Sequence, residues 1–238
     1  MFDFTDKVVI VTGAAGNLGS SVAQEFLNSG ANLVLVDHSR GIFSSLFPEL
    51  IDSKDHLLAE GVDLTEKEPI RRLADKAYQQ LGSIDALVNV AGGYRAGTTV
   101  QDTPSETWDF LLDLNARTVL YTCQAVIPIM LKQGSGKIIN IAARQGLKGG
   151  ARMGAYSVSK SAVIRLTESM SAELKANNIN VNCILPGTID TPENREAMPT
   201  SDFKRWVSPN ALSEVILFLA SPSARAIHGA SLPVYGLS

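Results

Sequence analysis

The chain has 238 residues, of which 45% are hydrophobic and 19% charged, and its net charge is −3. This composition is typical of one soluble α/β domain, and it offers no basic surface for nucleic acid. The longest apolar runs are too short to span a bilayer, and the first residues lack the basic and apolar parts of a signal peptide. We therefore predict one cytoplasmic domain over residues 1–238, with neither nucleic acid nor membrane as partner.

The first part of the chain has the order strand, glycine-rich turn, helix, strand, acid. The apolar run 7–11 predicts a strand buried on both faces, and the helical pattern after residue 18 ends at Gly30. A second apolar strand over 33–36 ends at Asp37. This order is typical of a dinucleotide-binding unit.

The turn between the first strand and the helix carries Gly13, Gly16 and Gly19. Glycines in such a turn allow a tight bend, close approach of the backbone to a pyrophosphate, and close packing of helix on strand. The helix begins near Asn17 and Leu18, where unpaired N–H groups and a partial positive charge favour phosphate. We predict that these five residues bind the pyrophosphate of a dinucleotide.

Asp37 stands where a carboxylate accepts hydrogen bonds from the adenosine ribose hydroxyls. A carboxylate there repels a 2′-phosphate, which favours NAD over NADP. His38 and Arg40 follow closely, and Arg40 can offset that repulsion. The pattern therefore predicts NAD as the preferred cofactor and NADP as the alternative.

Strand and helix patterns alternate to the end of the chain, which predicts a doubly wound parallel sheet, the Rossmann fold, with about seven strands and helices on both faces. Capping residues are expected at Thr65 with Glu68, at Thr103 with Glu106, and at Asn210. One long helix is expected with Pro104 at its first position, running through Asn115 to about residue 127. The later strands are predicted over 57–62, 84–90, 137–142, 180–185 and 231–234.

Ligands of such sheets bind beyond the carboxyl ends of the strands. The residues that fall at these ends are Asp37, Asp63, Ala91 with Gly92, Ala142 with Ala143, and Pro186 with Gly187. Cys123 and Cys183 lie in apolar patterns and are expected to be reduced core thiols. Because the three histidines are scattered, no metal site is predicted.

Tyr156 and Lys160 stand four residues apart, which places them on one face of a helix, one turn apart. The ammonium can lower the phenol's pKa from its free value of about 10 and make it a general acid or base. An exposed helix face is the alternative for this pair. Asn115 lies inside an apolar pattern, where it either faces solvent or is buried with hydrogen-bond partners.

Together these residues resemble the short-chain dehydrogenase/reductase family over about residues 5–236. The markers are the turn 12–19, Asp63, the segment 89–92, Asn115, Tyr156 with Lys160, Pro186 with Gly187, and Thr191. The resemblance implies hydride transfer between the nicotinamide C4 and the carbon of a carbonyl or alcohol, or of a C=N group, in a small-molecule substrate. It also implies a homodimer or homotetramer formed through the helices that carry Asn115 and Tyr156.

The resemblance implies a role for each matching residue. Tyr156 moves the proton on the substrate oxygen, and Lys160 binds the nicotinamide ribose and lowers the tyrosine pKa. Asn115 holds a water that links Lys160 to solvent. The implied cofactor-binding residues are Gly13, Gly16, Asn17, Leu18, Gly19, Asp37, Asp63, Leu64, Asn89, Ala91, Gly92, Tyr156, Lys160, Pro186, Gly187, Ile189 and Thr191.

Two departures from the family pattern concern the backbone. Asn17 occupies the place where compact members often have the middle glycine. Because Asn can adopt left-handed backbone geometry, we expect binding to survive. Val90 replaces an Asn of the usual Asn-Asn-Ala-Gly, which is expected to remove one structural hydrogen bond.

The third departure concerns the chemistry, because Ala143 stands where the family has its catalytic serine. Loss of one oxyanion donor costs on the order of 10²–10³ in rate. Three explanations are open. Either the substrate does not need that donor, as in the dihydropteridine-reductase branch, or Arg144, Gln145 or Ser135 replaces it, or the protein binds nucleotide in a regulatory or structural role. Retention of Tyr156, Lys160 and Asn115 favours an enzyme.

A short substrate lid is expected at about 191–208, with Trp206 as a packing residue. Arg95, Arg144 and Arg152 lie near the expected cleft and would favour an anionic substrate, although each alone is a common surface charge. The sequence thus predicts a reaction class and leaves the substrate open.

Overall fold

The computed structural model describes residues 2–237, so Met1 and Ser238, the ends of the predicted domain, lie outside the described residues. Seven parallel strands form one sheet in the order β3-β2-β1-β4-β5-β6-β7. The strand order reverses between β1 and β4, which makes the crevice beyond their carboxyl ends the expected ligand site. The strands are β1 Val8–Thr12, β2 Asn32–Val36, β3 Leu57–Ala59, β4 Ala86–Asn89, β5 Gly136–Ile141, β6 Ile179–Pro186 and β7 Ser231–Val234.

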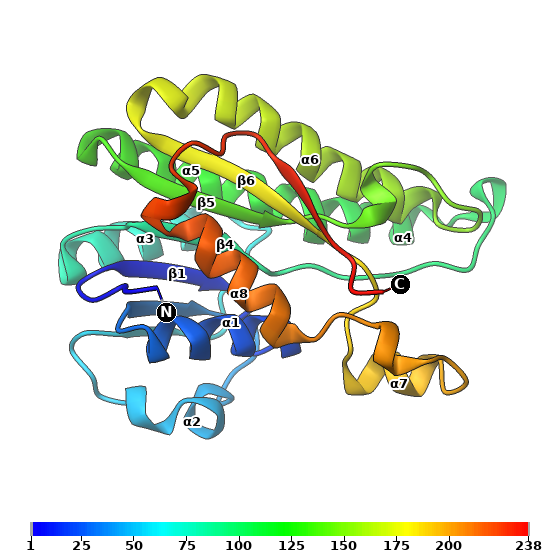
Figure 1. The fold of residues 1–238 in the computed structure, drawn as a ribbon, viewed down its shortest axis with the longest axis horizontal. Helices are drawn as coiled ribbons and strands as arrows, with labels where there is room; N and C mark the ends of the chain where they lie inside the picture. Colours follow the sequence, from blue (N-terminus) through cyan, green and yellow to red (C-terminus); the bar gives the residue numbers. More distant parts are fainter. Residues whose placement is uncertain (1, 238) are drawn as a thin grey trace.

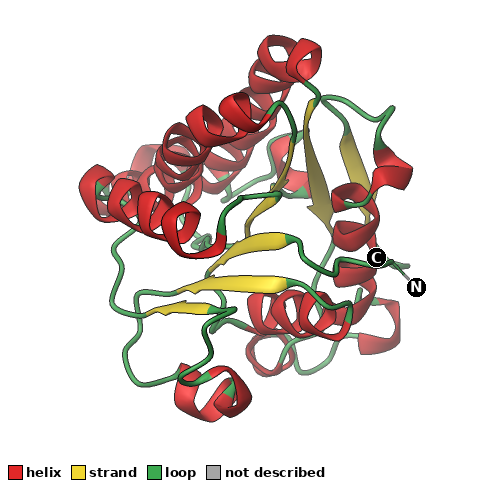
Figure 2. Ribbon diagram, turned by 90° about the vertical axis from the view of Figure 1, so that its left-hand side faces the viewer, coloured by secondary structure: helices red, strands yellow, loops and turns green. Residues whose placement is uncertain are grey.

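Helices cover both faces of the sheet, as Figure 2 shows. α1 (Asn17–Asn28) and α8 (Pro209–Ala220) pack on one face. α3 (Lys67–Leu81), α5 (Thr118–Gln133) and α6 (Gly154–Leu174) pack on the other (Figure 1). Every residue of β1 and β6 is buried, because both faces of these strands are covered. The structure confirms the predicted doubly wound fold. The remaining helical segments are α2 (Phe43–Leu46), α4 (Ser105–Leu112), α7 (Pro192–Ala197) and short 3-10 turns.

The predicted helix caps are wrong in detail. The Thr65 hydroxyl donates to Asp63 Oδ1 over 2.6 Å, and α3 begins two residues later without a side-chain cap. The Thr103 hydroxyl donates to a carbonyl four residues upstream. α8 is capped by Ser208, whose Oγ accepts from the Ala211 N–H, rather than by Asn210. Short polar side chains have several local backbone partners, so a spacing rule selects among them poorly.

The long helix predicted through Asn115 contains a π-helical turn, Asp113–Arg117, between α4 and α5. Such a turn inserts an extra residue and rotates the helix beyond it, and it is frequent at functional sites. Here it lies where Asn115 is turned inward, with 1% of its surface exposed. The structure thus decides between the two alternatives for Asn115 in favour of a buried residue.

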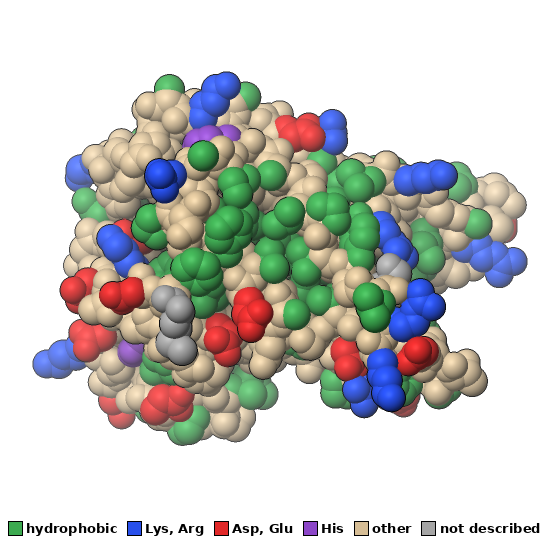
Figure 3. Space-filling view, viewed as in Figure 1, with side chains coloured by type: hydrophobic (Ala, Val, Ile, Leu, Met, Phe, Trp, Pro, Cys, Tyr) green, Lys and Arg blue, Asp and Glu red, His purple; other side chains and the backbone are tan. Residues whose placement is uncertain are grey.

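The C-terminal segment crosses the face of the molecule seen in Figure 1 and ends beside the lid. The Leu237 carbonyl accepts two hydrogen bonds from the Arg205 guanidinium, and its N–H donates to the Arg205 carbonyl. Figure 3 shows hydrophobic side chains gathered on this face, over the region of α8 and β7. Within residues 2–237, we find no helix with the length and apolar character needed to cross a membrane.

Candidate active site

The glycine-rich turn after β1 is closed to side chains at two positions. A Cβ at Gly13, whose φ is +64°, would lie 2.9 Å from the backbone of Ala91. A Cβ at Gly19 would lie 2.0 Å from the Gly13 carbonyl oxygen. At Gly16 the nearest atom would be 3.4 Å away, which is an ordinary contact. Gly13 therefore seats the turn against the exit of β4, and Gly19 seats α1 against the turn.

The N-terminus of α1 has no side-chain cap. Gly16 precedes the helix with φ −75° and ψ 164°, and the helix begins at Asn17. Asn17 is absent from the described residues with positive φ, so the left-handed geometry that Asn can adopt is not used there. Its amide Nδ2 instead donates to the Glu193 carboxylate of α7 over 2.8 Å. The first backbone N–H groups of α1, at Asn17, Leu18 and Gly19, point out of an uncapped helix end.

Asp37 lies directly after β2, with 5% of its surface exposed. Its Oδ2 accepts from the Ala15 N–H over 3.0 Å and its Oδ1 from the Ser39 N–H over 2.9 Å. His38 Nδ1 lies 3.2 Å from the same Oδ1. The carboxylate is therefore held beneath the glycine-rich turn by backbone groups.

Asp63 and Leu64 lie together beyond β3. The Asp63 carboxylate is exposed and accepts from both the hydroxyl and the N–H of Thr65, and these hydrogen bonds lower its pKa. Leu64 is buried beneath it. At the end of β1, Thr12 Oγ1 accepts from the Ala91 N–H over 3.2 Å and so ties β1 to the segment after β4.

The Asn89 side chain is buried between β5 and α5. Its Nδ2 donates to Asn140 Oδ1 over 2.9 Å, and its Oδ1 accepts from the Thr122 hydroxyl over 2.8 Å. Asn140 in turn donates to Thr167 on α6. This chain of buried polar groups joins β4 and β5 to α5 and α6, and it occupies both side-chain atoms of Asn89 that can form hydrogen bonds.

Lys160 on α6 is buried and donates to the Ile141 carbonyl at the end of β5 over 2.9 Å. Burial lowers its pKa to about 8. A Cβ at Gly92 would lie 3.2 Å from Lys160 Nζ and 2.8 Å from Asn115 Oδ1. The three predicted residues Gly92, Asn115 and Lys160 therefore meet in one place, although they come from three different elements.

Asn115 joins the loop after β4 to α6. Its Oδ1 accepts from the Gly93 N–H over 2.9 Å, and its Nδ2 donates to the Gly93 carbonyl and to Ser159 Oγ over 3.0 Å each. Ser159 also donates to the Tyr156 carbonyl. Sequence reasoning missed Ser159, and its place one residue before Lys160 is the signal that was available.

Tyr156 is half-buried, and its ring meets the ring of Tyr94 edge to face at 4.8 Å between centroids. The pKa of Tyr156 is raised to about 12, first by burial and second by repulsion from Tyr94. The expected lowering of this pKa by Lys160 is wrong for this structure. The Lys160 ammonium is bonded to the Ile141 carbonyl, and burial is the larger effect on the phenol.

Ala143 follows β5 in extended backbone geometry and is 4% exposed. Arg144 is exposed, and its guanidinium lies 5.3 Å from the ring centroid of Tyr235, just beyond β7. Ser135 precedes the start of β5, at the opposite edge of the sheet. The proposal that Ser135 replaces a donor near Ala143 is therefore wrong.

The remaining predicted residues follow β6. Gly187 donates to the Val234 carbonyl, which ties Pro186 and the strand end to β7. Asn194 links two others, since its N–H donates to Thr191 Oγ1 at the start of α7 and its Nδ2 to the Ile189 carbonyl. The expected lid thus consists of α7 and a 3-10 turn, Phe203–Arg205, with the Trp206 ring packed 4.8 Å from the ring of Phe203.

A family model described as short chain dehydrogenase matches residues 7–202, a range that contains the glycine-rich turn, Asn115, Tyr156 and Lys160. The chain belongs to this family.

Among curated relatives of this short-chain dehydrogenase, the 3-oxoacyl-acyl-carrier-protein reductase FabG of Thermotoga maritima is 31% identical over 238 residues, covering 97% of this chain and 96% of the relative. The solved structure of NAD⁺-bound xylitol dehydrogenase superposes with a TM-score of 0.88 at 30% identity, over 98% of this chain and 99% of the other. Carveol dehydrogenase from Mycobacterium avium, in complex with NAD, gives 0.87 at 25% identity, over 99% and 98%.

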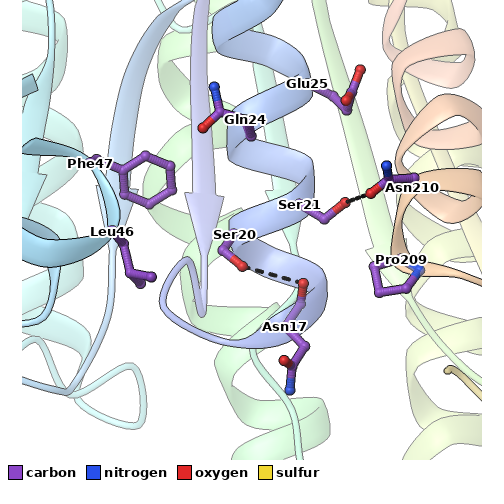
Figure 4. A pocket seen from close by; sticks show the side chains of 9 residues that line it. All are labelled: Asn17, Ser20, Ser21, Gln24, Glu25, Leu46, Phe47, Pro209 and Asn210. Atoms are coloured by element: carbon purple, nitrogen blue, oxygen red, sulfur yellow. Dashed lines mark hydrogen bonds between the residues drawn. The ribbon is translucent and has the colours of Figure 1, made fainter. Parts of the chain in front are cut away.

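A pocket of ≈ 410 Å³ lies outside the short-chain dehydrogenase crevice, between α1, the C-terminal end of α2 and the start of α8 (Figure 4). Of the predicted site residues it contains Asn17 alone. Among residues 2–237 no group of three or more His, Cys, Asp or Glu is placed to hold a metal. Both cysteines are free and buried, and burial raises the pKa of each thiol.

Proposed function

We propose that the protein is a short-chain dehydrogenase/reductase that moves hydride between the nicotinamide of NAD, with NADP as the weaker alternative, and a small carbonyl, alcohol or C=N substrate. The observation that carries this proposal is the meeting of Lys160, Asn115 and Gly92 at the carboxyl edge of the sheet. Tyr156 lies one helical turn from Lys160, on the same helix. The uncapped N-terminus of α1 opens at the same edge.

The described residues fit a dinucleotide. The N–H groups of α1 have no side-chain cap, and at Gly13 the turn lies so close to Ala91 that a Cβ there would be 2.9 Å from its backbone. When bound, the cofactor supplies or accepts the hydride at C4 of its nicotinamide. The residues that would hold it are Gly13, Gly16, Asn17, Leu18, Gly19, Asp37, Asp63, Leu64, Ala91, Gly92, Lys160, Pro186, Gly187, Ile189 and Thr191, with Asn89 behind them.

Tyr156 is the proton donor of this proposal. Because its pKa stands at about 12, the phenol keeps its proton at neutral pH and is ready to protonate the oxygen of a carbonyl being reduced. In the oxidative direction the same phenol has to lose its proton first, and Lys160 is the group that would favour the phenolate. Asn115 would hold the loop at Gly93 in place while the proton moves.

NAD is preferred in this proposal because the Asp37 carboxylate is buried and fixed where a 2′-phosphate would be repelled. The Arg40 guanidinium lies against the loop at Gly61, because a Cβ added to Gly61 would be 2.6 Å from the Cζ of Arg40. Two similar structures contain NAD, which supports the same preference. Titration of NADH and NADPH by fluorescence tests it, and tighter NADPH binding would contradict it.

We infer that Ala143 stands in the place of the family serine, so that this enzyme works without that hydroxyl. Retention of half-buried Tyr156 together with buried Lys160 and Asn115 supports an enzyme over a nucleotide-binding regulatory or structural protein. Turnover separates these two functions.

The test is Tyr156→Phe, assayed by NADH oxidation with a panel of simple ketones, 2,3-butanedione and quinonoid dihydropterin. Loss of a general acid is expected to lower turnover by about 10²–10⁴-fold. The Kd of NADH should stay within about twofold, because the phenol is not among the groups that bind phosphate or adenosine. Undiminished turnover in the variant would refute Tyr156 as the donor. Tight NADH binding without turnover in the unmodified protein would favour the regulatory alternative.

We further propose a cytoplasmic homodimer or homotetramer formed through the helices that carry Asn115 and Tyr156. Large apolar side chains are exposed on these helices and on α4, namely Trp108, Leu120, Leu131 and Val158. Sedimentation velocity tests this assembly, and a monomer at micromolar concentration would contradict it.

A further inference from the structure

A second phenol lies beside Tyr156 on the open side of the site. Tyr94 follows the Gly92-Gly93 pair, and its ring meets that of Tyr156 edge to face, with 81° between the planes. Tyr94 is 60% exposed, whereas Tyr156 is half-buried. Tyr94 therefore presents most of its surface to solvent directly beside Tyr156.

The loop that carries Tyr94 is held on both sides. On one side, Asn115 binds both the N–H and the carbonyl of Gly93, and a Cβ at Gly93 would lie 2.7 Å from Leu114. On the other side, the Arg95 guanidinium lies 3.5 Å from the ring centroid of Phe110. A donor whose backbone is already fixed loses little freedom when it bonds a substrate.

The residue inferred to replace the family serine offers no hydrogen-bond donor in its side chain. Ala143 is apolar and buried, and the guanidinium of the next residue, Arg144, lies over Tyr235. An oxygen that receives a proton from Tyr156 would thus find no hydroxyl at position 143, and Tyr94 is the hydroxyl-bearing residue whose ring touches that of Tyr156.

We propose that the Tyr94 hydroxyl donates a hydrogen bond to the substrate oxygen in addition to that from Tyr156. Tyr94 thereby takes the role that a serine has in other members of the family. The inference rests on the proposed function. In carbonyl reduction, hydride adds to the substrate carbon, the C=O π pair moves to oxygen, and the proton of Tyr156 bonds to that oxygen. Tyr94 keeps its own proton and stabilises the charge on oxygen while it develops.

The surroundings of Tyr156 also support the state that this step needs. Burial, the larger cause that raises the pKa of Tyr156, keeps the donor protonated at neutral pH. The edge-to-face contact fixes the two rings relative to each other. Tyr94 therefore contributes to the site even before a substrate binds.

The test compares Tyr94→Phe, which removes only the hydroxyl, with Tyr94→Leu, which removes the ring as well. The matched control is Tyr78→Phe, which removes a hydroxyl near the C-terminal end of α3, at the opposite edge of the sheet. The assay is reduction of 2,3-butanedione by NADH. Tyr94→Phe is expected to lower kcat/KM by about 10²-fold, as for loss of one oxyanion donor. The Kd of NADH and the rate of the control should be unchanged.

A serine introduced at position 143 gives a second measurement, which would not change if the role of Tyr94 were only structural. Ala143→Ser should recover about tenfold or more of the activity lost in Tyr94→Phe, and should change the otherwise unmodified protein by less than about threefold. Isobutyramide, an unreactive carbonyl compound, should bind the enzyme–NADH complex about tenfold more weakly in Tyr94→Phe.

Three outcomes would overturn the inference. The first is an undiminished kcat/KM in Tyr94→Phe, with a loss seen only in Tyr94→Leu. The others are no recovery of activity by Ala143→Ser, and a loss of NADH affinity in Tyr94→Phe as large as its loss of kcat/KM. The first would make Tyr94 an apolar wall of the substrate site. Failure of the proposed function is recognised separately, because then the unmodified protein does not bind NADH or Tyr156→Phe keeps its turnover.

Discussion

The two halves of the crevice are formed by different kinds of chemical group. Around β1, α1 and β2 the site consists mainly of backbone, with uncapped N–H groups and a turn too close for side chains at Gly13 and Gly19. Its one predicted polar side chain, the Asp37 carboxylate, is itself held by the N–H groups of Ala15 and Ser39. Around β4, β5 and α6 it consists of buried side chains. Lys160 and Asn115 there bond to carbonyls and to a loop N–H.

This difference predicts opposite responses to substitution. A backbone-built site tolerates no added atoms, because the groups that bind also define the fold. In a site built from buried polar side chains, the desolvation of these groups lowers the free energy of unfolding. Truncating such a side chain can therefore abolish catalytic activity and still leave a stable protein. Substitutions in each half therefore test whether the two halves differ in this way.

The largest effect is expected in the nucleotide half, from Gly19→Ala. The added methyl would lie 2.0 Å from the Gly13 carbonyl, so α1 has to move away from the turn. We expect a loss of about 3 kcal/mol in unfolding free energy and at least about tenfold in NADH affinity. Urea unfolding and NADH fluorescence measure the two.

Gly16→Ala is the matched control for Gly19→Ala, because its methyl would meet only an ordinary contact at 3.4 Å and the φ of −75° suits alanine. Its stability should be unchanged or slightly raised. If the two variants unfold at the same urea concentration, the nucleotide half is more adaptable than a site built from backbone should be.

The halves also differ in how much their sequences predicted. The nucleotide half is a local pattern, and its parts lie within the first 37 residues, so strand, turn, helix and acid were all found in place. The edge strand Ser231–Val234 was likewise predicted with the bounds that the structure shows. Short-range periodicity and glycine placement carry that information.

The features that the sequence did not reveal depend on contacts between distant segments. Asn17 and Glu193 are 176 residues apart, and Tyr94, whose ring contacts Tyr156 of α6, lies on the loop after β4. The π-helical turn at Asn115 results from packing and has no local signature. The direction of the Tyr156 pKa shift was predicted wrongly because burial, which no spacing reveals, outweighs the neighbouring ammonium.

A smaller effect, of opposite sign, is expected in the catalytic half from Lys160→Met. The amine has a pKa of about 8 in the folded protein against an ordinary value of 10.5, so between these values the unfolded chain binds more protons. The stability of the unmodified protein therefore rises as pH increases from about 8 to about 10.5, and below pH 8 the buried ammonium lowers stability. At pH 7, Lys160→Met is expected to gain about 1–2 kcal/mol, since the lost hydrogen bond to Ile141 offsets part of the gain, and to lose turnover.

Urea unfolding at pH 7 and pH 10 checks this, because the advantage of Lys160→Met should shrink at the higher pH. Lys137→Met is the control: Lys137 is also partly buried with a lowered pKa, but it lies at the start of β5, at the opposite edge from the site. That variant should keep its turnover. An advantage of Lys160→Met that does not change with pH would show that packing, rather than charge burial, sets the stability of this half.

The smallest effect is expected where the nucleotide half meets the lid through side chains, at the hydrogen bond between Asn17 and the Glu193 carboxylate of α7. This carboxylate lies beside the N-terminus of α1, so it competes for the same positive end with a pyrophosphate and repels it. Glu193→Gln should therefore tighten NADH binding by about two- to threefold at low salt, with the gain disappearing at high salt. Glu196→Gln on the same helix, also exposed, removes one charge without a contact to Asn17 and is the control. If Glu193→Gln weakens binding instead, the carboxylate is needed to hold α7 over the crevice, and a side chain of the lid then contributes to nucleotide binding beside the backbone groups of this half.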